Sequence, residues 1–98
     1  MPVKVITTFT YPHSGVSSYV NRNENINQLV AKYRDANRII DSGKTTSEDG
    51  LVETRFRVFA DKKSYEEFIS EAEQFRKGER EQWALENKVD FDVTVVEE

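Results

Sequence analysis

The order of two kinds of hydrophobic repeat limits what this chain can fold into. Three segments alternate between a more apolar and a more polar set of side chains, and these are residues 3–11, 51–60 and 89–96. Such alternation is typical of strands that bury one face. Two further segments carry apolar side chains three and four positions apart, and these are residues 26–40 and 65–75. That spacing places the apolar side chains on one face of a helix.

Between the two helical segments we expect a hairpin across residues 38–60. The Asp49-Gly50 pair favours its tight turn, and the first of its strands is the weaker and lies at an edge. The full order is then strand, helix, strand, strand, helix, strand. It predicts an α+β protein with the ferredoxin-like βαββαβ fold, in which two helices cover one face of a four-stranded antiparallel sheet. Right-handed crossovers place the first and third strands in the centre.

The chain of 98 residues fits a single domain that spans residues 1–98. At the start of the second helix, Ser64 and Glu67 have the spacing of a capping box. Further along, Lys77-Gly78 either bends this helix or ends it. The residues that follow then add further helical turns.

Placing the more apolar side chains of each strand toward the helices assigns its two faces. On the first strand the inward set is Val3, Val5, Thr7, Phe9 and Tyr11. On the third strand it is Val52, Thr54, Phe56, Val58 and Ala60. The open face then mixes apolar and charged side chains: Lys4, Ile6, Thr8, Thr10, Leu51, Arg55, Arg57, Phe59, Asp90, Asp92 and Val96. Opposite charges on such a face can complement each other across a two-fold axis, so we expect a homodimer through it.

Composition disfavours several classes of function. The formal net charge of −4 disfavours nucleic acid and anionic membranes as partners. The chain has no cysteine, which leaves no disulfide and no thiolate nucleophile. It also shows no secretory signal and no apolar run long enough to span a membrane. We therefore expect a cytoplasmic protein with no nucleic-acid partner, no membrane partner, no metal and no cofactor.

One short motif suggests nucleotide binding but does not support it. Gly43-Lys44-Thr45 is similar to the end of a phosphate-binding P-loop, yet that loop needs a glycine where this chain has Arg38. A strand follows the motif in place of the required helix. We interpret the segment as the polar end of an edge strand, a placement that discourages stray strand pairing.

The only histidine, His13, follows the first strand and is a weak candidate for a catalytic base. A solvated loop histidine is the alternative interpretation. Ser14, Ser17 and Ser18 lie near it, but no nucleophile-elbow motif accompanies them. Turn formation explains these serines.

A small-molecule site is predicted where polar residues interrupt the apolar stripes. Thr7, Asn37 and Thr54 can point into one space beside Tyr33 and Trp83. An apolar pocket with a few convergent polar groups is typical of a ligand site. We therefore predict these five as ligand-binding residues. The alternative is that the threonines bond to backbone and that Asn37 caps a helix.

The strand order, the chain length and the passage from Phe59 and Asp61 to Glu66 and Phe68 resemble the dimeric α+β barrel proteins. That group includes the antibiotic-biosynthesis-monooxygenase-like domains. The resemblance covers nearly the whole chain and implies a substrate cavity between sheet and helices, often lined by Trp, Asn and His. The chain has one Trp and one His, and Asn37 is the asparagine on its helical stripe, but none occupies a family motif position.

Two functions remain open from the sequence. In the first, a small dimeric ferredoxin-like protein binds a small organic ligand between sheet and helices, with cofactor-independent monooxygenase or isomerase chemistry as its catalytic version. In the second, the protein is a non-catalytic interaction or regulatory module that acts through its dimer or helix surface. A ligand-sized cavity favours the first, and a filled core with an apolar surface patch favours the second.

Overall fold

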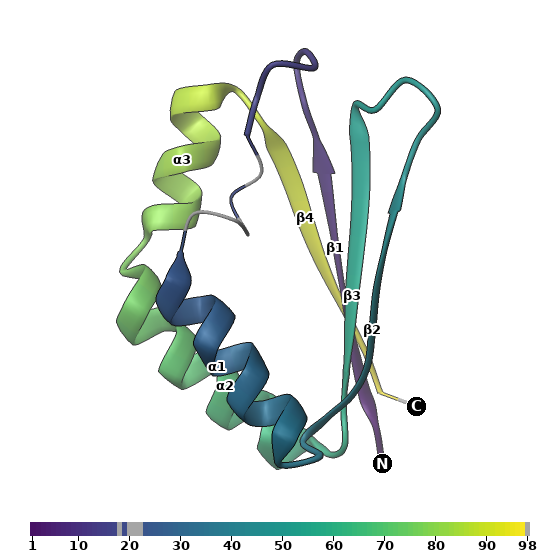
Figure 1. The fold of residues 1–98 in the computed structure, drawn as a ribbon, viewed down its shortest axis with the longest axis vertical. Helices are drawn as coiled ribbons and strands as arrows, with labels where there is room; N and C mark the ends of the chain where they lie inside the picture. The colour runs from purple at the N-terminus through teal and green to yellow at the C-terminus, as the bar shows by residue number, and fades with distance from the viewer. Residues whose placement is uncertain (18, 20–22, 98) are drawn as a thin grey trace.

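The computed structural model describes residues 1–17, 19 and 23–97. Its elements follow the order β1 (Val3–Thr10), α1 (Glu24–Asp35), β2 (Ile39–Thr46), β3 (Val52–Phe59), α2 (Lys62–Arg76), α3 (Glu79–Asn87) and β4 (Asp90–Glu97). The strands form one antiparallel sheet in the order β2-β3-β1-β4. All of the described helices lie on the same side of this sheet (Figure 1). The predicted ferredoxin-like fold is confirmed, with β1 and β3 at the centre.

Asparagines flank helix α1 on both sides. The side-chain oxygen of Asn23 accepts a hydrogen bond from the Ile26 N–H at 3.2 Å, which caps the helix. Past its other end, Asn37 adopts a left-handed conformation with φ of 58°. Asn tolerates this region better than most residues, so the chain can reverse there into β2.

The N-cap of helix α2 lies three residues before the predicted one. Asp61 is the N-cap, and its carboxylate accepts a hydrogen bond from the Ser64 N–H at 2.7 Å. The hydroxyl of Ser64 instead accepts a hydrogen bond from Arg38 Nε at 3.1 Å. The helix ends at Lys77 and Gly78, both with positive φ, and α3 starts at once after them. The Lys77-Gly78 break was predicted, but Ser64 as the N-cap was wrong.

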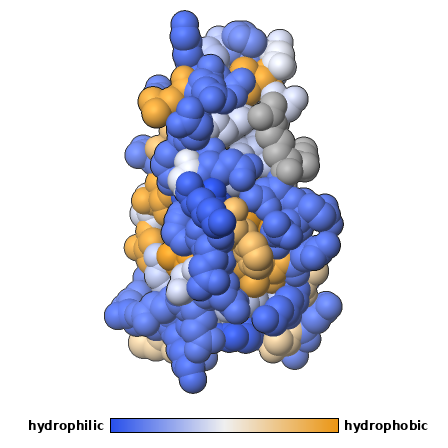
Figure 2. Space-filling view, turned by 90° about the vertical axis from the view of Figure 1, so that its left-hand side faces the viewer, coloured by the Kyte–Doolittle hydropathy of each residue, from blue (hydrophilic) through white to orange (hydrophobic). Residues whose placement is uncertain are grey.

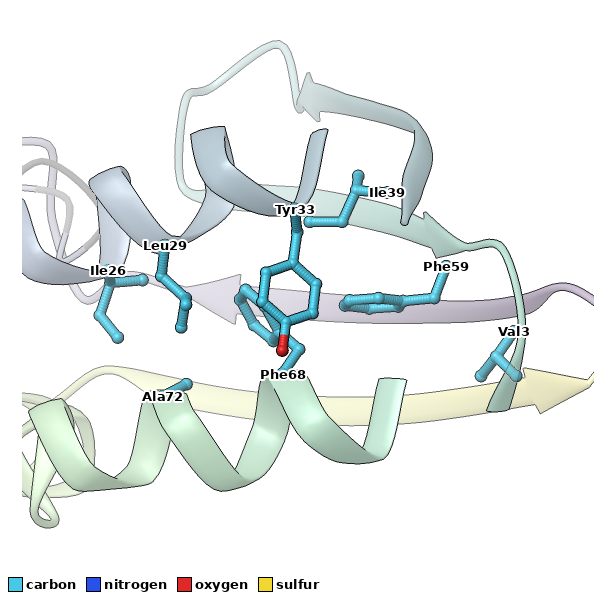
Figure 3. Close-up of a cluster of buried hydrophobic side chains, with 8 residues drawn as sticks. All are labelled: Val3, Ile26, Leu29, Tyr33, Ile39, Phe59, Phe68 and Ala72. Atoms are coloured by element: carbon cyan, nitrogen blue, oxygen red, sulfur yellow. The ribbon is translucent and has the colours of Figure 1, made fainter. Parts of the chain in front are cut away.

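Two apolar clusters fix the helices to the sheet. The first lies where α1 and α2 meet the ends of β1 and β3, and contains Val3, Ile26, Leu29, Tyr33, Ile39, Phe59, Phe68 and Ala72. In Figure 3, Tyr33 extends from α1 toward α2 beside Phe68 and Phe59. The second cluster lies under α3 and contains Phe9, Tyr11, Tyr19, Trp83, Ala84 and Val89. The helical layer is therefore attached to the sheet at two separate places.

The pairing of β3 with β1 corrects the predicted faces of β3. Directly opposed residues share a face, and Phe59 lies opposite Val3 while Arg57 lies opposite Val5. Continuing this register places Arg55 and Glu53 toward the helices as well. The prediction that Val52, Thr54, Phe56 and Val58 face the helices, with Arg55, Arg57 and Phe59 on the open face, is wrong.

The physical reason is that a strand has only two choices of parity, and a shift by one residue reverses every side chain. Phe59 is 1% exposed in the first cluster and occupies one choice. Phe56 takes the other side, where Lys4 Nζ lies 4.8 Å from its ring centroid. Gly43 lies opposite Phe56, and a Cβ there would approach the ring to 2.5 Å. This glycine makes room for the Phe56 ring on the open face.

Candidate functional site

A cavity of about 420 Å³ lies between the sheet and the helices. Its wall includes Ile26, Phe59 and Phe68 of the first cluster, and Phe9 and Tyr19 of the second. The cavity therefore occupies the space between the two attachment points of the helical layer. Seen from the helix side, the surface is mostly hydrophilic, with smaller hydrophobic areas (Figure 2).

One part of the cavity wall is apolar. It includes Val5 and Phe9 of β1, Ile26 and Val30 of α1, and Phe68 of α2. Thr7 lies between Val5 and Phe9 on the same strand face and also lines the cavity. Asn23 and Asn27 contribute amide groups from the start of α1. Such a surface suits an organic molecule better than a bare ion.

The other part of the wall is strongly basic. Its basic residues come from α1, β2, β3, α2 and α3, and are Arg34, Lys44, Arg55, Arg57, Arg76 and Arg80. No aspartate or glutamate is among the described residues that line the cavity. In a chain of net charge −4, this concentration of positive charge is a local feature of the site.

Glu53 neutralises one side of the basic wall. It is 7% exposed on β3, and its carboxylate accepts a hydrogen bond from Arg55 Nε at 2.7 Å. Lys44 Nζ lies 4.0 Å from the other oxygen, Oε2, and the Tyr11 hydroxyl donates to Oε1 at 3.4 Å. Arg55 and Lys44 thus have a shared carboxylate.

Arg57 is in a different position. It is surrounded by protein but keeps part of its surface open to the cavity, and its guanidinium lies 5.4 Å from the Phe68 ring centroid. Burial, followed by the charges of Arg76, Arg55, Arg80 and Arg34, lowers the pKa of Arg57 to about 10. Desolvation and like charges both disfavour the protonated form.

Arg76 and Arg80 complete this side of the wall. Arg76 is 8% exposed, and burial together with the charge of Arg80 lowers its pKa. The Arg80 guanidinium lies 4.9 Å from the Phe91 ring centroid. In both residues the buried Nε has no hydrogen-bond partner within the part of the chain that the structure describes. Unpaired buried donors of this kind are rare, so these two need an explanation.

The structure separates the five predicted ligand-binding residues. Thr7 lines the cavity, but Thr54 lies opposite Thr8 on the other face of the sheet. Asn37 is exposed beyond the end of α1. The prediction that Thr7, Asn37 and Thr54 point into one space is therefore wrong, and of these three Thr7 lines the cavity. A role in ligand binding stays a prediction for the five residues.

Tyr33 and Trp83 are core residues and do not line the cavity. The Tyr33 hydroxyl donates to Glu71 Oε2 at 2.6 Å, and burial together with this carboxylate raises the pKa of Tyr33 to about 12. Trp83 packs edge-on against Phe9 in the second cluster, with ring centroids 6.0 Å apart. Tyr33 instead packs against Phe68 and Trp83 against Phe9, and Phe68 and Phe9 line the cavity.

His13 is exposed in the loop after β1 and is not part of the cavity wall. Its Nδ1 accepts a hydrogen bond from the Gly15 N–H at 3.2 Å, a local turn contact. Ser14 and Ser17 are exposed as well, and Ser18 lies outside the described residues.

Among the described residues no group of His, Asp and Glu is arranged to hold a metal ion. None of the described helices has the length and apolar character needed to cross a membrane.

The strand alternation hid the basic wall, but two other features of the sequence indicated it. Ser64, Phe68, Ala72 and Arg76 are the buried residues of α2 and lie four positions apart. Arg76 thus continues the buried stripe, which indicates a guanidinium directed at the protein interior. For Arg55 and Arg57, the signal was that they share parity with Phe59.

Solved structures of other proteins have the same fold. A dimeric ferredoxin-like protein from an uncultured marine organism matches with a TM-score of 0.72 at 11% identity, over 97% of this chain and 92% of that chain. Rv0793 from Mycobacterium tuberculosis matches with 0.66 at 18% identity, over 100% and 95%. SnoaB, a cofactor-independent oxygenase from Streptomyces nogalater, matches with 0.56 at 10% identity, over 99% and 92%. No protein-family model matches the sequence, and no curated protein is significantly similar to it.

Proposed function

We propose, from the ferredoxin-like fold that this chain shares with these solved proteins, that it binds a small organic ligand between its sheet and its helices. The observation that carries the proposal is the cavity of about 420 Å³, which lies within the range of ligand pockets. The wall combines an apolar part with convergent polar groups. A ligand-sized cavity was the feature that distinguishes this function from an interaction module with a filled core.

A pair of variants on one helix tests ligand binding in the cavity. Ile69 of α2 lines the cavity and is 38% exposed, so Ile69→Trp fills space without overpacking the core. Its neighbour Ser70 is exposed and does not line the cavity, so Ser70→Trp is the matched control. A library of small organic compounds is screened by thermal shift. Compounds that stabilise the wild type and Ser70→Trp, but not Ile69→Trp, support the proposal. Compounds that stabilise all three equally bind elsewhere and contradict it.

A catalytic version of this function is supported by the basic wall. Cationic groups in a water-poor site stabilise an oxyanion that forms during reaction, as in oxygenation or isomerisation of an ionised phenol or enol. SnoaB, with the same fold, is described as a cofactor-independent oxygenase. Oxygen consumption and product mass are measured with each compound that binds. Compounds that bind and return unchanged, without oxygen uptake, leave binding alone as the function.

We further propose a homodimer through the open face of the sheet. After the correction of β3, this face carries Ile6, Phe56 and Val96 beside Lys4 and Asp92. Apolar side chains flanked by opposite charges suit a two-fold contact, and one structure with this fold is described as dimeric.

The mass in solution tests the dimer. Light scattering during size exclusion is expected to give twice the chain mass, and Ile6→Lys is expected to give the single mass. Leu85→Lys is the control, because Leu85 is 78% exposed on α3, on the helix side of the sheet. A wild-type mass equal to one chain at every concentration contradicts the dimer.

A further inference from the structure

The cavity gathers six of the fourteen lysines and arginines of the chain, although the chain as a whole is acidic. These six residues belong to five different elements, so no single amphipathic segment accounts for them. Folding is therefore what brings the positive charges together. A cluster of like charges costs free energy unless opposite charges offset it, so the next question is which groups compensate these six cations.

Pairing within the protein offsets only part of this charge. Glu53 holds Arg55 and Lys44, as described above. For Arg57, Arg76 and Arg80 no carboxylate lies within ion-pair distance among the described residues. The aromatic contacts of Arg57 with Phe68 and of Arg80 with Phe91 stabilise a cation more weakly than a buried carboxylate does.

Arg57, Arg76 and Arg80 all line the cavity. Arg76 and Arg80 each have a buried Nε without a partner in the described chain, and both residues line the cavity. Arg57 also lines the cavity, and burial together with its cationic neighbours lowers its pKa. A negatively charged group in the cavity would accept hydrogen bonds from the guanidinium groups and relieve their mutual repulsion. Arginine suits this role because its planar fork can hold two oxygens at once.

The apolar part of the wall determines the rest of the ligand. Val5, Ile26, Val30 and Phe68 present an apolar surface to the same space. An inorganic anion would leave this surface against water, whereas an organic acid covers it with its own apolar atoms. The two walls together therefore fit a molecule with an anionic head and an apolar body.

We infer that the ligand is an amphipathic organic acid, with its anionic head among Arg57, Arg76 and Arg80 and its apolar body against Val5, Ile26 and Phe68. This inference rests on the proposed function, because it names the chemical class of the ligand for the same cavity. It also assigns the three arginines as binding residues. The carboxylate is an organic head group whose two oxygens match the guanidinium fork.

The test compares probes of one shape and different charge on the full chain. Binding of 2-naphthoate and of its neutral analogue 2-naphthamide is measured by isothermal titration calorimetry, with sodium sulfate as a third probe. We expect the naphthoate to bind at least about tenfold more tightly than the amide, because charge-assisted hydrogen bonds to arginine are lost with the amide. Sulfate is expected to bind more weakly than the naphthoate, since it leaves the apolar wall uncovered.

Variants then assign the charge preference to named residues. Arg57→Met and Arg76→Met are each expected to weaken naphthoate binding about tenfold and to change naphthamide binding by less than about twofold. Lys63→Met is the matched control, because Lys63 is exposed on α2 and does not line the cavity. Arg57→Lys keeps the charge and is expected to recover part of the affinity. Circular dichroism confirms that each variant is folded.

The contrary outcomes separate this inference from the proposed function. Equal binding of naphthoate and naphthamide, still abolished by Ile69→Trp, overturns the anionic head and leaves ligand binding in the cavity intact. Binding of sulfate without naphthoate overturns the amphipathic ligand. If naphthoate does not bind at up to about 1 mM while library compounds still distinguish the wild type from Ile69→Trp, the amphipathic acid is overturned and ligand binding in the cavity stands.

Discussion

The central strands β1 and β3 are paired residue by residue, yet they present opposite chemistry to the same helices. At one end Val3 faces Phe59, and both are buried in the first cluster. Farther along, Val5 lies opposite Arg57, and Thr7 lies opposite Arg55. The helix-facing residues of β1 are thus uncharged, while those of β3 in this region are arginines. The difference shows that a central position in a sheet does not by itself require an apolar inward face.

A single apolar residue, Phe59, determines that the arginines of β3 face the helices. Phe59 fixes the parity of the strand in the core, and every second residue before it must then face the same side. The resulting conflict between local pattern and fold is concentrated at the cavity. Natural proteins depart from the simplest pattern mostly at functional sites, which agrees with the proposed role of these arginines.

The largest effect that separates the two faces of β3 is expected from Phe59→Ala. It removes a fully buried ring from the first cluster, so it is expected to lower the free energy of unfolding by about 3–5 kcal/mol. Phe56→Ala is the control, because Phe56 is only partly buried on the other face and is expected to cost about 1–2 kcal/mol. Urea denaturation measures both. A greater loss for Phe56→Ala would contradict the assigned faces.

The next largest effect has the opposite sign. Arg57→Leu is expected to raise the free energy of unfolding of the ligand-free protein by on the order of 1–3 kcal/mol, because it removes a buried charge held among like charges. Arg55→Leu is the control and is expected to give no such gain, since it leaves the buried Glu53 with less compensation. Destabilisation by Arg57→Leu, measured by urea denaturation, would contradict an uncompensated charge.

The pH dependence of the Arg57→Leu gain follows from the lowered pKa of Arg57. Below pH 10 the arginine is charged in both the folded and the unfolded protein, so the whole penalty is present. As the pH rises above about 10, the folded protein releases this proton before the unfolded protein does, because its Arg57 pKa is the lower of the two, and the penalty falls. The stability difference between variant and wild type is therefore expected to narrow as the pH rises through 10. A difference that widens there would contradict the direction of the shift.

The sequence was sufficient for the fold because each element carried its own signal. The alternation in β1 and β4, the Asp49-Gly50 turn and the Lys77-Gly78 break all correspond to the structure. The same alternation failed in β3, where its two faces differ little in apolar content. Phe56 and Phe59 compete for the core from opposite parities, and only the pairing with β1 decides between them. Because the site depends on that parity, Thr54 was placed inside the cavity and Arg57 outside it.

A smaller effect is expected where β3 balances its own charge. Glu53→Gln removes the carboxylate that Arg55 and Lys44 share, so the unfolding free energy is expected to fall by about 1–2 kcal/mol. Glu66→Gln on the exposed side of α2 is the matched control and is expected to stay within about 0.5 kcal/mol. Thermal denaturation of both variants measures the difference. Equal stability of the two would show that Glu53 does not offset the charge of the basic wall.

The smallest effect is expected from Thr7→Val on β1. Valine has nearly the shape of threonine and suits a strand, so the free energy of unfolding is expected to change by less than about 0.5 kcal/mol. If β1 contributes shape and β3 contributes charge, naphthoate affinity is also expected to change by less than about threefold, against about tenfold for Arg57→Met. Thr8→Val, on the open face, is the control for removal of a hydroxyl from the same strand. A tenfold loss for Thr7→Val alone would assign a ligand hydrogen bond to the Thr7 hydroxyl. Both β1 and β3 would then bind the polar head of the ligand, and the division between an uncharged β1 and a charged β3 would no longer describe the site.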